Sequence, residues 1–209
     1  MSPQDNELGR LRDRLVVASL AHVPFDGWSR TALHMGAEDI GLTAAEADRA
    51  FPDGGRDMIA WHSMLADRRM VEGLAELDLP GMKIRERIAT GVRLRFEQNA
   101  AHREAIRKGL AFLALPGNAP LSLKLLHRTV DEIWHAAGDT ATDWNYYSKR
   151  MLLAGVYSST LLCWLNDSSE GFEETWAFLD RRISDVMKIP ALKAKAGKIF
   201  GAIPRRLRV

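Results

Sequence analysis

Cysteine is nearly absent from this sequence: Cys163 is the only one among 209 residues. A disulfide within one chain is therefore excluded, which is typical of a protein from a reducing compartment. No run of residues approaches the roughly 18 consecutive apolar side chains of a membrane span. Residues 1–15 contain acidic side chains and no apolar core, so they resemble neither a secretory signal nor a transit peptide. We therefore expect a cytoplasmic protein.

Motifs of catalysis are also missing. The sequence has no GxSxG, no glycine-rich phosphate loop and no CxxC. Glu132 and His135 form one ExxH pair, the unit of carboxylate-bridged di-iron sites in helical bundles. Such a site needs two ExxH pairs and two further glutamates, and the sequence has no second pair. Cys163 lies in an apolar segment, where an inert core thiol is the commoner case. The sequence thus predicts neither an enzyme nor a metal or cofactor site.

Strand-like alternation is not found, whereas apolar residues recur at helical spacing along the chain. Ser29 is well placed to cap one helix, and Thr43 with Glu46 forms a capping-box pattern at the start of another. Gly41 and Gly138 stand where helices should end. The sequence predicts an all-α protein with a turn at 22–28 and helices at 7–20, 30–39, 43–51, 56–76, 82–97, 101–115, 119–137, 144–165 and 172–187.

The segment 144–165 is apolar on every side of the predicted helix. Placed at about 100° per residue, Trp144, Met151 and Leu162 share one side, and Tyr146, Leu153 and Trp164 lie opposite. A helix that is apolar all round must be covered all round. It is therefore either the central helix of a bundle or a core helix whose outer face meets another protein. Its tyrosine-rich first turn adds weight to an interface.

Charge is distributed unevenly along the chain. Residues 1–80 carry eight Lys/Arg and fourteen Asp/Glu, whereas residues 188–209 carry seven basic residues and no acidic one. Between 189 and 207 the large apolar side chains fall within a helical arc of about 100°. This pattern is typical of an interfacial helix and suits lipid better than a protein core. The alternative is a last helix docked on the domain. The predicted membrane-binding residues are Leu192, Ile199, Phe200 and Ile203.

The three short helices at the front, followed by the break at 51–54 and a longer helix, resemble the N-terminal domain of TetR-type regulators. Lys and Arg contacts to phosphates supply most non-specific DNA affinity. The predicted third helix offers only Arg49, against Glu46 and Asp48. We therefore expect a degenerate, vestigial helix-turn-helix and no nucleic acid partner.

The whole chain resembles the ubiquinone-biosynthesis accessory protein family, whose members have a TetR-like helical fold. The resemblance is carried by HVPFDGWS, KIRERIATGVRLR, LALPGNAPLSLKLLHRTVDEIWHAAGDTATDWNYYSKRMLLAGVYSSTLLCWL and EETWAFLDRRI. Its most distinctive part is the block GDT-x-TD-x-N-x-Y-x-K/R-R, which spans residues 138–150. The missing transit peptide points to a bacterial member. Trp144 stands where many members carry Phe, which is an apolar exchange.

This resemblance implies a non-catalytic role. Family members bind isoprenoid lipids in an apolar pocket and rest on the membrane through a C-terminal amphipathic helix. They present the quinone substrate to demethoxyubiquinone hydroxylase, which is itself the di-iron enzyme. Carried over by position, Asp143, Trp144, Tyr146 and Tyr147 match the partner-docking block, and Arg150 matches the contact to the lipid head group. The apolar stripes add a predicted pocket lining of Leu94, Leu126, Trp134, Leu153, Tyr157 and Trp176.

The expected architecture has three parts: a TetR-like helical region at 1–78, a lipid-binding bundle at 79–187 and a basic amphipathic membrane-binding helix at 188–209. We expect a bound isoprenoid quinone, its precursor or a phospholipid, and peripheral association with the inner face of a bacterial membrane. TetR-like folds commonly form dimers, so a homodimer is expected. Two alternatives stay open: a TetR-type DNA-binding regulator that senses a lipid, and a scaffold without a ligand.

Overall fold

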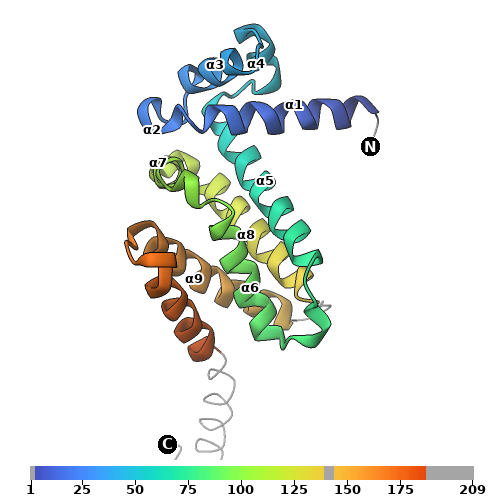
Figure 1. The fold of residues 1–209 in the computed structure, drawn as a ribbon, viewed down its shortest axis with the longest axis vertical. Coiled ribbons are helices and arrows are strands. Elements are labelled where there is room, and N and C mark those ends of the chain that lie inside the picture. The colour runs from blue at the N-terminus through green and yellow to red at the C-terminus, as the bar shows by residue number, and fades with distance from the viewer. Residues whose placement is uncertain (1–2, 139–143, 187–209) are drawn as a thin grey trace, which may run out of the picture. The chain divides into compact units, whose positions relative to one another are not determined.

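The computed structural model describes the backbone of residues 3–138 and 144–186, and the side chains of residues 6–138 and 147–186. The chain divides into two compact units, Met1–Arg150 and Met151–Val209, and each is described by itself. All regular structure within the described residues is helical (Figure 1). This confirms the predicted all-α class.

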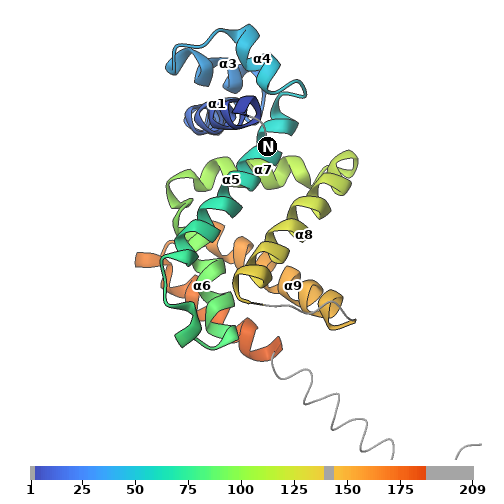
Figure 2. The ribbon, with the colours of Figure 1, turned by 90° about the vertical axis from the view of Figure 1, so that its right-hand side faces the viewer.

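The first unit contains eight α-helices and the start of a ninth. Their bounds are α1 Pro3–Ser19, α2 Val23–Asp26, α3 Arg30–Asp39, α4 Ala44–Ala50, α5 Gly55–Ala75, α6 Ile84–Glu97, α7 Arg103–Leu113, α8 Ala119–Ala136 and α9 Trp144–Asn166. Single turns of 3-10 helix join some of them: η1 Leu79–Gly81, η2 Ala100–His102 and η3 Pro116–Asn118. Both ribbon views place α3 and α4 on one side of α1 and α5–α8 on the other (Figures 1 and 2).

The two predicted N-caps, Ser29 and Thr43, begin α3 and α4 as expected. The Ser29 hydroxyl accepts a hydrogen bond from the Ala32 N–H at 3.2 Å and caps α3. At α4, the Thr43 hydroxyl accepts from the Glu46 N–H while the Glu46 carboxylate accepts from the Thr43 N–H. One prediction is wrong: residues 23–26, expected as part of a turn, form the short helix α2, because a proline in its first turn fits a helix start.

The core of the N-terminal helices reaches the rest of the first unit through Trp28. Trp28 is 8% exposed, and its indole N–H donates to the Ala105 carbonyl of α7 at 2.8 Å. Gly55, at the start of α5, lies so close that an added Cβ would sit 1.8 Å from the Trp28 carbonyl oxygen. Only glycine permits this approach of two backbones. Trp28 therefore fixes both α5 and α7 against the N-terminal helices.

The bundle of α5, α6 and α8 is joined by a buried ion pair. Asp67 is 1% exposed, and its carboxylate accepts from the Arg95 guanidinium at 2.8 Å and from the Thr129 hydroxyl at 2.9 Å. The three residues come from α5, α6 and α8 in turn. A buried charge that lacks its partner is costly, so this cluster fixes one arrangement of the three helices.

The described part of the second unit consists of α9 from Met151 onward, the turn η4 Glu170–Phe172 and a helix at 173–186. Asp167 joins the two helices: its carboxylate accepts from the N–H and hydroxyl groups of both Ser169 and Thr175, at 2.6–2.9 Å. Burial alone would raise the pKa of Asp167, but these hydrogen bonds outweigh burial and hold the pKa well below its usual range. Asp167 therefore stays ionised and fixes the turn.

Within the described residues, no single helix has both the length and the apolar composition needed to cross a membrane. The segments Ala100–Leu113 and Pro116–Ala136, which meet at a bend of 98°, reach that length and composition only as a pair.

Candidate functional site

Helix α9 has a buried side and an exposed apolar side. Leu153 and Tyr157 are buried at 4% and 5% exposure. In contrast, Tyr147 is 64% exposed, Met151 76% and Leu162 58%. At 3.6 residues per turn these three side chains fall within an arc of about 60°. Of the two interpretations of this segment, the structure favours the helix whose outer apolar face is open. We call Tyr147, Met151 and Leu162 the open face of α9.

The predicted docking block is only partly described. Tyr147 belongs to the open face of α9. The backbone of Trp144 and Tyr146 forms the first turn of α9, but their side chains lie outside the described residues, as does all of Asp143. The predicted membrane-binding residues Leu192, Ile199, Phe200 and Ile203 also lie outside the described residues. These assignments stay predictions.

Arg150, the predicted contact to a lipid head group, is buried and paired. Its side chain is 7% exposed, and its Nε donates to the Asp131 carboxylate of α8 at 2.6 Å. Sequence reasoning missed Asp131. The available signal was an arginine within an apolar helix, which needs a carboxylate partner if it is buried. Because Asp131 is 42% exposed, the pair reaches solvent on its acidic side.

Trp134 lies beside this pair and carries an unmatched donor. The ammonium of Lys149 lies 5.4 Å from the Trp134 ring centroid, within the range of a cation–π contact. The indole N–H of Trp134 is buried and donates to no acceptor among the described residues. An indole N–H buried in a protein usually has a partner. Asp131, Trp134, Lys149 and Arg150 all belong to the first unit, and we call them the α8–α9 cluster.

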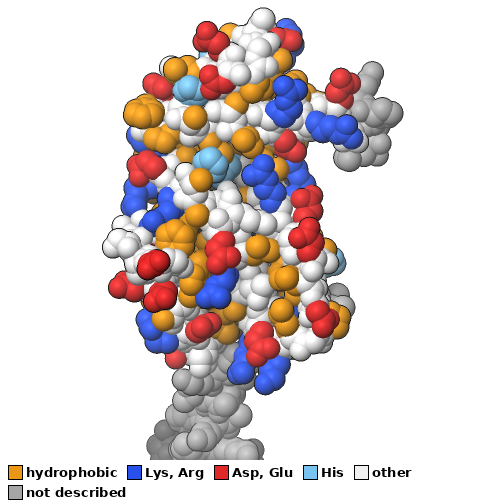
Figure 3. All heavy atoms as spheres, in the orientation of Figure 1, with side chains coloured by type: hydrophobic (Ala, Val, Ile, Leu, Met, Phe, Trp, Pro, Cys, Tyr) orange, Lys and Arg blue, Asp and Glu red, His pale blue; other side chains and the backbone are white. Residues whose placement is uncertain are grey.

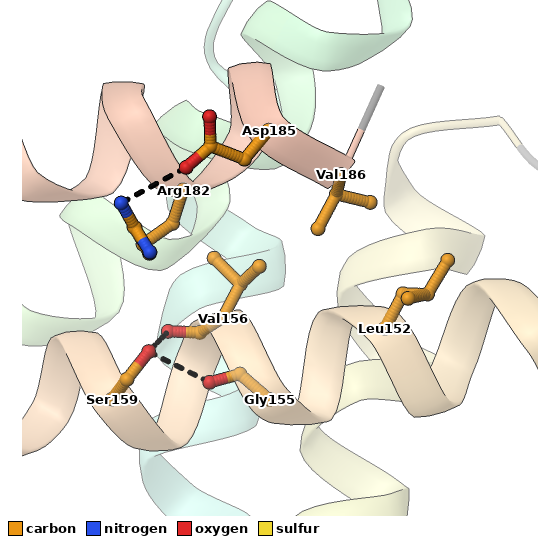
Figure 4. Close-up of a pocket in the computed structure, with 7 residues that line it drawn as sticks. All are labelled: Leu152, Gly155, Val156, Ser159, Arg182, Asp185 and Val186. Carbon is orange, nitrogen blue, oxygen red and sulfur yellow. Dashed lines mark hydrogen bonds and ion pairs between the residues drawn. The ribbon is translucent and has the colours of Figure 1, made fainter. Parts of the chain in front are cut away.

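A pocket of about 330 Å³ opens in the second unit (Figure 4). Val186 points toward Val156, and Leu152 completes the apolar part of the wall. The polar groups around it are mutually satisfied, because Arg182 pairs with Asp185 at 2.9 Å and the Ser159 hydroxyl donates to the Gly155 carbonyl at 2.7 Å. The lining residues are Leu152, Gly155, Val156, Ser159, Arg182, Asp185 and Val186.

None of the six predicted lining residues lines this pocket. Leu94, Leu126 and Trp134 are half-buried in the first unit, and Leu153, Tyr157 and Trp176 are buried in the second. Leu94 packs closely against α5, where a Cβ added to Gly73 would lie 2.7 Å from its Cδ2. Apolar stripes identify buried faces but not which of them surround a cavity. The usable signal was Gly155 with Ser159, two small residues one helical turn apart.

Around α3 and α4, the side chains of Arg30 and His34 are engaged by neighbouring acceptors. Arg30 donates to both the Asp48 carboxylate and the Pro52 carbonyl. The hydrogen bond from His34 is the largest contribution that lowers the pKa of Asp48, followed by Arg30. Figure 3 shows acidic and basic side chains interspersed over this region rather than a basic patch. This arrangement lacks the concentration of positive charge that DNA phosphates require.

The ExxH pair contributes no metal cluster among the described residues. Glu132 is half-buried and His135 exposed, and within that part of the chain no group of three or more His, Cys, Asp or Glu side chains could hold a metal ion. Cys163, expected as a core thiol, is half-buried.

Comparison with known proteins gives one consistent family. The family model described as COQ9 matches residues 119–190, which include α8, α9 and the α8–α9 cluster. The ubiquinone biosynthesis protein COQ9 of Rattus norvegicus is 35% identical over 190 residues, covering 86% of this chain and 60% of the relative. COQ9-B of Xenopus laevis is 38% identical over 185 residues, covering 85% and 63%. The human protein is 35% identical, covering 86% and 58%. The chain thus spans about three fifths of the length of these mitochondrial relatives.

Structural similarity supports the fold. A TetR transcriptional regulator from Nitrosomonas europaea ATCC 19718 superposes with a TM-score of 0.69, covering 84% of this chain and 97% of the regulator. At 19% identity this similarity shows the fold alone, and it confirms the predicted TetR-like architecture. Together with the similarity in sequence, it confirms the resemblance inferred from the sequence segments: the chain is similar to the COQ9 family, by the family model over residues 119–190 and by curated relatives at 35–38% identity.

Proposed function

We propose that this protein is a non-catalytic, lipid-binding accessory protein of ubiquinone biosynthesis. In this proposal it binds isoprenoid quinone intermediates at the membrane and presents them to demethoxyubiquinone hydroxylase. The observation that carries the proposal is the similarity over about 86% of the chain to proteins named for ubiquinone biosynthesis. A chain that binds and presents a substrate needs an apolar site, a polar contact for the head group and a surface for its partner.

The α8–α9 cluster supports the head-group contact. A quinone carbonyl and a phosphate both offer oxygen acceptors, and the buried indole N–H of Trp134 is a donor without one. Lys149 and Arg150 add positive charge to the same cluster. Their charge favours an oxygen-rich head group, while the pair with Asp131 keeps Arg150 neutralised when no head group is bound. We assign Trp134 the hydrogen bond and Arg150 the electrostatic contact.

The open face of α9 supports the partner contact. Tyr147, Met151 and Leu162 are exposed apolar side chains on one side of a helix, and protein interfaces are enriched in Tyr and Met. We propose that the hydroxylase covers this face, with Asp143, Trp144 and Tyr146 extending it. The basic tail, with Leu192, Ile199, Phe200 and Ile203, would hold the protein at an anionic membrane surface, and the protein would act as a homodimer.

A gene-deletion strain tests the function as a whole. Loss of the protein should lower ubiquinone and cause demethoxyubiquinone to accumulate, because the hydroxylase loses its presented substrate. The wild-type gene should restore the ratio, and a gene carrying Tyr147→Asp should not. A gene carrying Phe25→Asp is the matched control, since Phe25 is exposed but remote in sequence from α9. Unchanged quinone ratios in the deletion strain would refute the function.

Trp134→Phe tests the head-group contact separately. The exchange keeps an aromatic ring for Lys149 but removes the indole N–H, so co-purified lipid should fall while the fold is kept. The matched control is Trp61→Phe, which removes an indole N–H that donates to Asp13 at 2.7 Å. Equal lipid content in the two variants would remove Trp134 from the site.

A TetR-type regulator that senses a lipid is the second candidate, favoured by the structural similarity. It requires DNA binding by α3 and α4, whose Arg30 is engaged by Asp48 and Pro52. A mobility shift with the DNA upstream of its own gene distinguishes the two. Sequence-specific retardation would favour the regulator, and we expect none.

A further inference from the structure

The corner between α7 and α8 presents an exposed apolar surface in the first unit. Leu115 is 55% exposed and Leu123 is 67% exposed. We call residues 114–124 the corner. Figure 2 shows α7 turning into α8 at the edge of the first unit. The other exposed residues of the corner are Ala114, Pro116, Gly117, Ala119, Pro120 and Lys124.

Several backbone N–H donors of the corner are absent or already paired. Two of its residues are prolines, which have no N–H. Four further N–H groups are bonded within the turn: Ala114 to the Leu110 carbonyl, Leu115 to Phe112, Asn118 to Leu115 and Ala119 to Pro116. Backbone donors that are already paired can enter an apolar phase without the cost of an unmatched polar group.

The buried side chain of Asn118 anchors the corner to neighbouring helices. It is 9% exposed, and its side-chain amide donates to the Phe112 carbonyl at the end of α7 at 2.9 Å. Its side-chain oxygen accepts from Arg56 of α5 at 2.8 Å. The corner is therefore fixed to two helices, and its apolar side chains are presented by a rigid support.

The charge of this region has one sign. Between Glu104 and Asp131 the sequence contains no acidic residue. Within this stretch Lys124 is exposed directly beside Leu123, and Lys108 is half-buried in α7. Anionic lipid head groups attract basic residues near the surface by about 1 kcal/mol each. Apolar tips beside an exposed lysine, on a stretch of sequence without acidic residues, match the interface of an anionic bilayer.

We propose that this corner is a second membrane contact, in which Leu115 and Leu123 enter the interfacial layer of an anionic phospholipid bilayer. The side chain of Lys124 then meets the phosphates. A bilayer suits this surface better than a protein partner does, because its exposed residues are aliphatic, small or proline. The cores of protein interfaces are instead enriched in aromatic residues and arginine. The corner belongs to the first unit and is a different segment of the chain from residues 188–209.

A fluorescent label reports the insertion directly. In full-length protein, Cys163→Ser removes the one native thiol, and Leu123→Cys then carries an environment-sensitive dye. On vesicles that contain phosphatidylglycerol, the dye should shift to shorter wavelength and be quenched by a quencher attached to the lipid. The matched control is Phe25→Cys in the same background, since Phe25 is 85% exposed. The same response at both sites, or none at 123 while the protein is bound, would overturn the proposal.

Vesicle binding by substituted full-length protein gives the second measurement. Leu115→Ser with Leu123→Ser should weaken binding to anionic vesicles about tenfold, because two leucines no longer leave water. The variant Lys124→Glu should weaken binding to anionic vesicles and leave the weaker binding to neutral phosphatidylcholine vesicles unchanged. Phe25→Ser should have no effect. Unchanged binding of the double leucine variant, with its helical circular dichroism intact, would overturn the proposal.

The tail is separated from the corner by the variant Ile199→Ser with Phe200→Asp. If only the tail variant loses binding, the tail is the membrane contact and the corner is not. If the dye at 123 responds to the hydroxylase but not to vesicles, the corner contacts a protein, and the bilayer proposal falls. Neither result affects the proposed lipid presentation, which is measured by extracted lipid rather than by vesicle binding.

Discussion

The N-terminal helices and α9 differ in how completely their side chains are paired or buried within the protein. Around α3 and α4 the caps are made, Arg30 and His34 are engaged by Asp48, and Leu33 and Ala47 are fully buried. Helix α9 instead leaves Tyr147, Met151 and Leu162 in solvent. A region whose charged and apolar side chains are already paired or buried has few side chains free to contact a partner. The comparison indicates that the polar side chains around α3 and α4 serve stability, whereas α9 keeps an apolar surface exposed.

Breaking the buried ion pair should give the largest effect. Asp67→Ala leaves Arg95 buried without its carboxylate, which should lower the free energy of unfolding by about 3–5 kcal/mol. Urea unfolding followed by circular dichroism measures the loss. The control is Asp13→Ala, which breaks the pair of Asp13 with Arg68 at the surface and should cost much less. A smaller loss for Asp67→Ala than for Asp13→Ala would contradict the structure.

Trp134→Ala and Tyr147→Ala should separate folding from binding. Truncating the half-buried Trp134 should cost about 3–5 kcal/mol of stability. Tyr147→Ala should leave thermal stability nearly unchanged because that side chain is 64% exposed. It should instead weaken association with the hydroxylase by about 1–2 kcal/mol, as an aromatic hot spot does. Binding titrations and thermal unfolding of both variants test this. If Tyr147→Ala unfolds the protein while Trp134→Ala has little effect, Tyr147 is the core residue and Trp134 the surface residue, which would contradict the structure.

A third effect depends on pH. His62 packs on Trp28, with ring centroids 5.4 Å apart, and burial lowers the pKa of His62 to about 3, helped by the charge of Arg95. The unfolded chain protonates this histidine near its ordinary pKa of 6.5, so stability should fall as the pH drops from 6.5 toward 3. Because the surface area of His62 shows it only half-buried, the slope should be at most about 1.4 kcal/mol per pH unit.

Unfolding at pH 7 and pH 5 measures this slope. His62→Gln should make stability less dependent on pH in this window, while His135→Gln, which alters an exposed histidine, should not. If the wild type and His62→Gln lose equal stability between the two pH values, the burial of His62 has been misjudged.

Local features of the fold were predictable from sequence, whereas pairings between helices were not. The caps of α3 and α4 depend on residues three positions apart, so the sequence shows them directly. Gly138 has φ +89°, as the end of α8 requires. The four-residue helix α2 was missed because so short a segment has no periodicity. The pairing of Arg150 with Asp131 was missed because it depends on how α8 meets α9, which neither helix specifies alone.

The candidate site was predicted only in part for the same reason. Tyr147 could be predicted to serve a partner contact, because the first turn of α9 does not need a tyrosine in order to form. Open and buried sides of α9 could not be distinguished, since both are apolar in sequence. The pocket in the second unit depends on Gly155 and Ser159 facing Val186 across two helices, which is a tertiary property.

Native mass spectrometry of the purified, full-length protein tests the central claim most directly. We expect a near-stoichiometric bound lipid that organic extraction identifies as an isoprenoid quinone, its precursor or a phospholipid. Trp134→Phe should lower this occupancy, and Trp61→Phe should not. Wild-type protein that repeatedly carries no lipid, prepared gently from cells that make ubiquinone, would contradict the account.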